Sequence, residues 1–186
     1  MVTLRDDNRN VVLIGFMGCG KTTIGRQLAS RLEFGFTDTD ALIEARIGVS
    51  IPEFFASHGE AAFRDIEQEV VSKVAKLANQ IIATGGGAIL RDESRAVLSA
   101  GNAVVWLTAR PDVVVARTER RRGARPLLST EEDPLERVLR ILAIRGPLYQ
   151  SIADVIIDTS DRPVHRAVGD IVRKCVMPYR TGESTK

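Results

Sequence analysis

Short runs of consecutive apolar residues alternate along the chain with longer segments in which apolar residues recur every three or four positions. Consecutive apolar side chains are typical of strands buried on both faces, as in a parallel sheet covered by helices. The runs cover residues 11–14, 81–84, 103–107 and 155–157, and we expect a shorter strand over 34–37. The alternation predicts an α/β fold with about five parallel strands and right-handed crossovers.

The segments between these runs carry helix signals. Residues 22–32 place isoleucine and leucine side chains four positions apart, on one helical face. Ser50 and Glu53 have the spacing of a capping box, and Pro52 suits an early helical position, so a short helix should begin there and end at Gly59. Further helices are predicted over 60–77, 111–122, 134–147 and 162–175.

The composition is that of one globular domain. The chain has 186 residues, of which 44% are hydrophobic and 27% charged, and its net charge is +2. At this length roughly 70% of the unfolded surface is buried on folding, so no disulfide or metal is needed to hold the core. The near-neutral charge argues against a nucleic-acid partner. We predict a single domain over residues 1–186, with its core over 11–176 and frayed polar ends.

Cysteine usage and hydropathy bear on the compartment. Cys19 and Cys175 are too few for a disulfide scaffold and predict free thiols in a reducing compartment. No apolar run reaches the roughly 18 residues of a membrane span. The first ten residues lack the apolar segment of a secretory signal. These features predict a cytoplasmic protein with no membrane partner.

The strongest chemical signal is the segment GFMGCGKT at 15–22, which matches G-x-x-x-x-G-K-[ST] between a predicted strand and a predicted helix. Its glycines let backbone N–H groups close around an anion at the start of a helix. Lys21 then supplies charge to the β- and γ-phosphates, and the Thr22 hydroxyl is a ligand for Mg²⁺. The alternative is a glycine-rich turn without a ligand, which the flanking strand and helix disfavour.

Cys19 lies inside this loop, at a position that contributes backbone. Our hypothesis is that alkylation of Cys19 blocks ATP binding, because this residue borders the phosphates. The loop alone leaves the reaction open, since switch GTPases, motor ATPases and small-molecule kinases all share it.

Two further motifs follow predicted strands. Asp38 and Asp40, two positions apart on an extended segment, would point the same way. One could serve Mg²⁺ through water and the other could accept a hydroxyl proton; the alternative is a polar turn with a helix cap. Three glycines at 85–87 end another strand, where a ligand that touches backbone would require them. The alternative there is a tight turn.

Three arginines have both a functional and a structural interpretation. Arg64 could bind a ligand or pair with Glu67 on the surface. Arg125 lies in a basic segment with a glycine, which suits a lid over 117–130 that closes on phosphates, or a solvated turn. Arg145, near a predicted helix end, could reach a ligand or simply favour the helix dipole.

Taken together, these motifs resemble the shikimate kinase family. The matching segments occur in the family's order and spacing over roughly residues 11–165: GFMGCGKTT at 15–23, DTD at 38–40, FRDIE at 63–67, TGGG at 84–87, RPLL at 125–128 and RGPLY at 145–149. The resemblance implies a three-layer P-loop kinase fold with sheet order 2-3-1-4-5, related to nucleoside monophosphate kinases. It also implies ATP-dependent phosphorylation of the 3-hydroxyl group of shikimate, on the route to aromatic amino acids.

The resemblance also implies roles for particular residues. Lys21, Asp40 and Arg125 would be catalytic, with Asp40 as the base, and Thr22 and Asp38 would serve Mg²⁺. Helices over about 40–78 would bind the acceptor, whose contacts would be Asp40, Arg64, Gly86, Gly87 and Arg145. The ATP contacts would be Gly18, Cys19, Gly20, Lys21, Thr22, Thr23, Arg120, Arg125, Asp161 and Pro163. Arg120 and the turn over 158–163 would flank adenine.

Rival functions explain fewer of these residues. A gluconate or nucleoside monophosphate kinase gives no reason for TGGG together with Arg64 and Arg145. A non-catalytic relative would be expected to lose Lys21, Asp40 or Arg125, and all three are present. A nucleic-acid-dependent ATPase would need a broad basic face, which the net charge of +2 does not favour. We therefore expect a monomer whose partners are ATP and shikimate.

Overall fold

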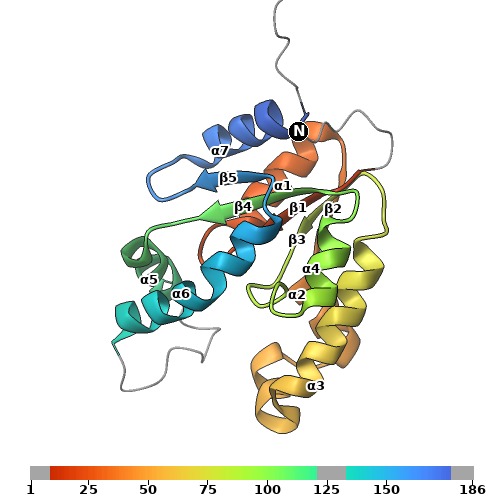
Figure 1. Ribbon diagram of the computed structural model, residues 1–186, viewed down its shortest axis with the longest axis vertical. Coiled ribbons are helices and arrows are strands. Elements are labelled where there is room, and N and C mark those ends of the chain that lie inside the picture. The colour runs from red at the N-terminus through yellow and green to blue at the C-terminus, as the bar shows by residue number, and fades with distance from the viewer. Residues whose placement is uncertain (1–8, 121–132, 177–186) are drawn as a thin grey trace, which may run out of the picture.

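The computed structural model describes residues 9–120 and 133–176, which form a parallel sheet between two layers of helices (Figure 1). The strand order is β2-β3-β1-β4-β5, and every neighbouring pair is parallel. The strands are β1 Val11–Ile14, β2 Gly35–Asp38, β3 Gln80–Ala83, β4 Ala103–Thr108 and β5 Val155–Asp158. The predicted fold class and sheet order are confirmed.

The helices alternate with these strands in sequence. They are α1 Lys21–Leu32, α2 Thr39–Ile47, α3 Ile51–Val74, α4 Asp92–Ser99, α5 Pro111–Glu119, α6 Pro134–Ile152 and α7 Val164–Ile171, followed by a short π-helix, η2 Val172–Val176. Within the described ranges, no helix is long and apolar enough to cross a lipid bilayer. Most of the predicted lid, including Arg125, lies outside the described residues.

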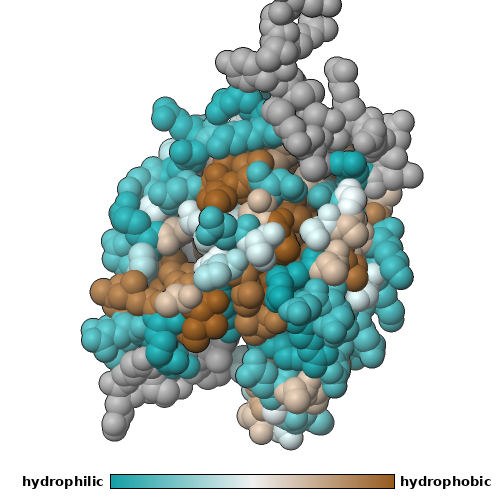
Figure 2. All heavy atoms as spheres, viewed as in Figure 1, coloured by the Kyte–Doolittle hydropathy of each residue, from teal (hydrophilic) through white to brown (hydrophobic). Residues whose placement is uncertain are grey.

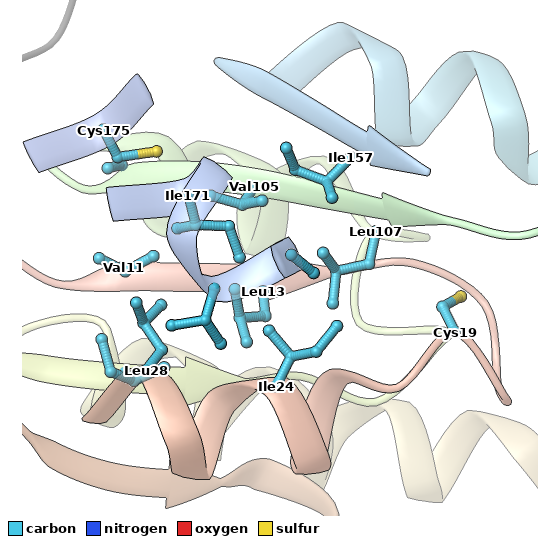
Figure 3. Packing of buried hydrophobic residues seen from close by; sticks show 14 of the residues in the cluster. Val11, Leu13, Cys19, Ile24, Leu28, Val105, Leu107, Ile157, Ile171 and Cys175 are labelled. Atoms are coloured by element: carbon cyan, nitrogen blue, oxygen red, sulfur yellow. The ribbon is translucent and has the colours of Figure 1, made fainter. Parts of the chain in front are cut away.

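The two faces of the sheet explain the consecutive apolar runs. Along β1, Val11 and Leu13 belong to one hydrophobic cluster, whereas Val12 and Ile14 belong to the other. Figure 3 shows the first cluster, where Ile24 and Leu28 of α1 and Ile171 of α7 gather around β1. Helices α3, α4 and α6 contribute to the second cluster. Because successive strand residues point to opposite faces, both must be apolar.

The edge strand β5 differs from the expectation of burial on both faces. Ile157 is buried, but Ile156 is 46% exposed. Among the residues that the structure describes, β5 pairs only with β4 and so forms one edge of the sheet. Figure 2 shows hydrophobic side chains interrupting the hydrophilic surface on this face, over β5 and α6. The apolar run therefore predicts the position of the strand correctly, but the expectation that both of its faces are buried is wrong.

Several helix boundaries also differ from prediction. Helix α6 continues through Pro147 to Ile152, because Tyr149 and Ile152 pack into the second cluster and outweigh the missing proline N–H. Within α3, however, Gly59 is non-helical at φ 77° and ψ 174° and joins two helices across a kink, so the predicted break at Gly59 is confirmed. Helix α3 ends at Val74 rather than near 77.

Two helices, α2 and α4, were not recognised from the pattern. Each buries only two residues, which leaves little apolar periodicity to detect.

Candidate active site

A cavity of about 380 Å³ opens at the carboxyl ends of β1, β2 and β3. Ligands bind at this end of parallel sheets because the strand-to-helix loops converge there. Eleven of the site residues predicted from the sequence line the cavity: Gly18, Gly20, Lys21, Thr22, Thr23, Asp38, Asp40, Arg64, Gly86, Gly87 and Arg145. Residues more than 120 positions apart in the chain thus form one surface.

The phosphate loop depends on glycine backbone geometry. Gly15, Gly18 and Gly20 have φ values of 136°, 79° and 92°, which other residues rarely adopt. The Lys21 ammonium donates to the carbonyl oxygens of Gly15 at 2.7 Å and Phe16 at 2.9 Å. The loop is therefore already curled, with its cation lying across it, and α1 begins directly after Gly20.

Cys19 contributes its backbone to this loop while its side chain joins the core. The side chain is 1% exposed, and its Sγ donates to the Phe16 carbonyl at 2.7 Å. Figure 3 shows it at the end of the first hydrophobic cluster, near Leu107. Burial raises the pKa of this thiol, which disfavours the reactive thiolate. The buried side chain is thus shielded from a thiol reagent in the native chain, and the effect of alkylation on ATP binding stays a prediction.

Asp38 connects the phosphate loop to α2. The Thr22 hydroxyl donates to Asp38 Oδ2 at 2.8 Å, while Asp38 Oδ1 accepts from the N–H groups of Asp40 at 3.1 Å and Ala41 at 3.5 Å. Asp38 is therefore both a helix cap and a neighbour of Thr22. Asp40 lies in the first turn of α2, so the prediction that both carboxylates share one extended segment is wrong.

The Thr22–Asp38 pair suits a magnesium ion that arrives with a nucleotide. Mg²⁺ usually takes one or two protein oxygens and completes its shell with phosphates and water. Both side chains line the cavity. Among residues 9–120 and 133–176 there is no cluster of three or more acidic, histidine or cysteine side chains that could hold a metal on its own. The donors present therefore fit shared coordination with phosphates.

Asp40 faces a second, buried carboxylate across Gly85. A Cβ placed on Gly85 would lie 2.5 Å from Asp40 Oδ1 and 3.0 Å from Glu67 Oε1. The Gly85 N–H donates to Thr39 Oγ1 at 2.9 Å, which ties this turn to the start of α2. Burial raises the pKa of Glu67, and the charge of Arg64 opposes that rise. Glu67 was not predicted as a site residue.

Arg64 lies in a largely enclosed position. Its side chain is 12% exposed, and its guanidinium pairs with Glu67 and, at 3.0 Å, with Glu60. The rings of Phe55 and Phe63 lie 5.8 and 5.2 Å from it, within cation–π range. The predicted pairing with Glu67 is present, but the expectation that it is a surface pair is wrong. The three-residue spacing predicts that Glu67 pairs with Arg64, and only the fold shows that Glu67 is buried.

Arg145 reaches the glycine turn from α6, whereas Arg64 belongs to α3. Its Nη1 donates to the Gly86 carbonyl at 3.2 Å, and a Cβ on neighbouring Gly87 would overlap the Arg64 guanidinium. Arg145 lies in the interior of α6, so the alternative of a cation at a helix end is wrong. The turn therefore has one arginine against each of two successive glycines.

The segment predicted to flank adenine lies beside the phosphate loop, outside the cavity lining. Arg117 donates to the carbonyl oxygens of Gly18 at 3.2 Å, Thr159 at 2.6 Å and Ser160 at 3.2 Å. Arg120 follows α5 as an exposed cap, and Asp161 pairs with Arg110, which lowers the pKa of that carboxyl. Pro163 precedes α7. Arg117 was not predicted as a site residue, because in the sequence nothing but its position in α5 distinguishes it from the nearby arginines.

Comparison with known proteins agrees with this geometry. The family model described as shikimate kinase matches residues 17–176. A shikimate kinase of Pseudomonas savastanoi pv. phaseolicola is 46% identical over 166 residues, covering 89% of this chain and 95% of the relative. Another, from Caldanaerobacter subterraneus subsp. tengcongensis, is 41% identical over 165 residues, with the same coverage of both chains.

Solved structures show the same relation. Shikimate kinase from Acinetobacter baumannii in complex with shikimate superposes with a TM-score of 0.84 at 36% identity, covering 89% of this chain and 92% of that one. A gluconokinase from Sinorhizobium meliloti shares the fold alone, with a TM-score of 0.55 at 18% identity over 89% and 90% of the two chains. Since the family model and relatives above 40% identity both span most of its length, the chain belongs to the shikimate kinase family.

Proposed function

We propose that the chain transfers the γ-phosphoryl group of ATP to the 3-hydroxyl group of shikimate, giving shikimate 3-phosphate and ADP for aromatic amino acid synthesis. One observation carries the proposal: most residues of the phosphate loop, the Asp40 carboxylate and two arginines on a glycine turn line a single cavity. Such a cavity suits an acceptor that has both a carboxylate and a hydroxyl group. The solved relative whose description includes bound shikimate adds support.

Arg64 and Arg145 are the proposed carboxylate ligands. Guanidinium groups offer paired donors that match the two carboxylate oxygens. Both arginines meet the turn at Gly86 and Gly87, and the missing side chain of Gly87 leaves room for the Arg64 guanidinium beside the backbone. Anchoring one end of the acceptor restricts which hydroxyl group meets Asp40, and such positioning is a large part of phosphoryl-transfer catalysis.

Asp40 is the proposed base. Its carboxylate takes the proton of the acceptor hydroxyl as the oxygen forms a bond to the γ-phosphorus, and the bond from that phosphorus to the ADP oxygen breaks in line. Lys21 and Arg125 stabilise the charge on the transferring group; Arg125 lies outside the described residues. When bound, Mg²⁺ held by Thr22 and Asp38 would neutralise phosphate charge.

The nucleotide contacts that we propose are those of the loop, Gly18 to Thr23, together with Arg120, Asp161 and Pro163 near the base. The contacts of Arg117 with both the loop and the 159–160 segment favour adding it to this group. We further propose that the chain acts as a cytoplasmic monomer, for which light scattering of the purified chain tests the oligomeric state.

A coupled ADP-release assay with ATP and Mg²⁺ tests the function against shikimate, gluconate and a nucleoside monophosphate. Turnover with shikimate alone, with the phosphate on the 3-oxygen by NMR, is the expected result. Asp40→Ala should retain ATP binding and lose transfer, and Arg145→Ala should chiefly raise the KM for shikimate. Preferred turnover of another acceptor would contradict the proposal, and near-normal turnover by Asp40→Ala would remove Asp40 as the base.

A further inference from the structure

Tyr149 combines a core position with one polar contact to the active site. Its side chain is fully buried in the second hydrophobic cluster, where its ring stacks on Trp106 with centroids 5.6 Å apart. Its hydroxyl donates to the Gly86 carbonyl at 2.5 Å. Burial raises the pKa of Tyr149 far above that of an exposed tyrosine, so the hydroxyl remains a donor at any pH the enzyme meets.

The Gly86 carbonyl accepts two hydrogen bonds from the same helix. Tyr149 follows Arg145 by four residues in α6, so both side chains project from one helical face. A carbonyl oxygen has two lone pairs, and the hydroxyl of Tyr149 and the Nη1 of Arg145 occupy both. The tyrosine thus fixes the acceptor atom to which Arg145 is itself bonded.

The peptide that Tyr149 holds is central to the cavity. A Cβ on Gly86 would lie 3.5 Å from the Gly15 carbonyl oxygen and 3.6 Å from the Met17 nitrogen, so this glycine abuts the phosphate loop. Gly87, the next residue, lies against the Arg64 guanidinium. The 86–87 peptide therefore lies between the phosphate loop and both arginines that we assign to the acceptor carboxylate.

We propose that the Tyr149 hydroxyl is a positioning group for acceptor binding, and this inference rests on the proposed function. It holds the Gly86 carbonyl against α6, which fixes the positions of Arg145 and the Gly87 backbone relative to Arg64. The hydroxyl itself does not line the cavity. The ring packs in the core and the hydroxyl positions the Gly86 peptide, so a substitution that removes only the hydroxyl separates the two contributions.

The test is Tyr149→Phe, which retains the ring and removes the hydroxyl. We expect the KM for shikimate to rise about threefold to tenfold, the equivalent of losing one hydrogen bond, with the KM for ATP and kcat within twofold of wild type. The matched control is Ser151→Ala, which removes an exposed hydroxyl bonded to Leu148 in the same helix. That variant should leave both KM values unchanged.

Direct binding gives a second readout. Trp106 is the only tryptophan of the chain and stacks on Tyr149, so its fluorescence should follow a shikimate titration. The Kd for shikimate should rise by the same factor in Tyr149→Phe, without a change in nucleotide Kd. An unchanged KM and Kd for shikimate, or equal losses for both substrates, would overturn the inference. If wild type prefers another acceptor, the proposed function fails, and the KM for that acceptor decides the role of Tyr149.

Discussion

Replacing Gly85 with alanine should displace the proposed catalytic base. The added Cβ would lie 2.5 Å from Asp40 Oδ1 and 3.0 Å from Glu67 Oε1, whereas ordinary contacts begin at 3.4 Å. Glu67 is buried and paired with Arg64, so it has little room to move. Asp40 lines the open cavity and is the group that must yield. Gly85 does not have a positive φ, so alanine introduces no backbone strain of its own.

The size of the effect follows from the overlap. Asp40 Oδ1 must retreat by the difference between 3.4 and 2.5 Å, about 0.9 Å. A displacement of about 1 Å in a reacting group can lower the rate about 100-fold, because the aligned geometry is lost. We therefore expect kcat to fall about 100-fold. The phosphate loop contacts Gly86 rather than Gly85, so ATP affinity should be unchanged.

The assay measures kcat with shikimate at saturating ATP and Mg²⁺, together with ATP binding and thermal unfolding. Gly169→Ala in α7 is the control, since its Cβ would meet nothing within 4 Å. It should retain full activity and gain roughly 0.4–1 kcal/mol of stability, because alanine reduces the entropy of the unfolded chain. A folded Gly85→Ala variant with kcat within threefold of wild type would refute the reasoning.

Three further predictions concern buried groups. Burial raises the pKa of Cys19, and that of Cys175 to about 12, so a chromogenic thiol reagent should label both only after denaturation; rapid labelling of the native chain would contradict this. Burial raises the pKa of Glu67 above 4.5, so its favourable contribution is present below pH 4.5 and lost as the pH rises through the folded pKa. In urea unfolding, the free energy of unfolding of wild type should fall relative to that of Glu67→Gln as the pH rises from 4.5 through the folded-state pKa. A difference between the two that does not depend on pH would contradict this prediction. Arg117→Ala should cost about 1–3 kcal/mol by leaving carbonyls without a donor, and should raise the KM for ATP more than that for shikimate; equal rises would show that Arg117 is not specific to the nucleotide side.

The apolar pattern was a good guide to the sheet and a poorer one to the helices around the site. Strands β1, β3 and β4 lie within one residue of the predicted runs because both of their faces need apolar side chains. Helix α2 escaped detection because only Thr39 and Ile43 are buried, so its hydrophobic stripe is too short to show a period. Pro147 predicted a helix end that packing of Tyr149 and Ile152 overrode.

The sequence by itself determined which chemistry is available. Spacing alone identified the phosphate loop, because its function depends on a local backbone path that glycine permits. It also placed Asp38, Asp40 and the glycines at strand ends, since the carboxyl ends of parallel strands converge. These inferences need only local geometry and the rule that parallel strands require crossover helices.

Only the tertiary structure decided how these groups act on one another. The Arg64–Glu67 pair is nearly enclosed rather than on the surface, Arg145 bonds to Gly86 across 59 residues, and Tyr149 joins them through the same carbonyl. Burial and long-range contacts depend on how α3 and α6 pack over the sheet, and residue spacing does not encode that packing. The desolvation that raises the pKa of Glu67 is likewise a property of the packed fold, because it arises from neighbours far apart in the chain.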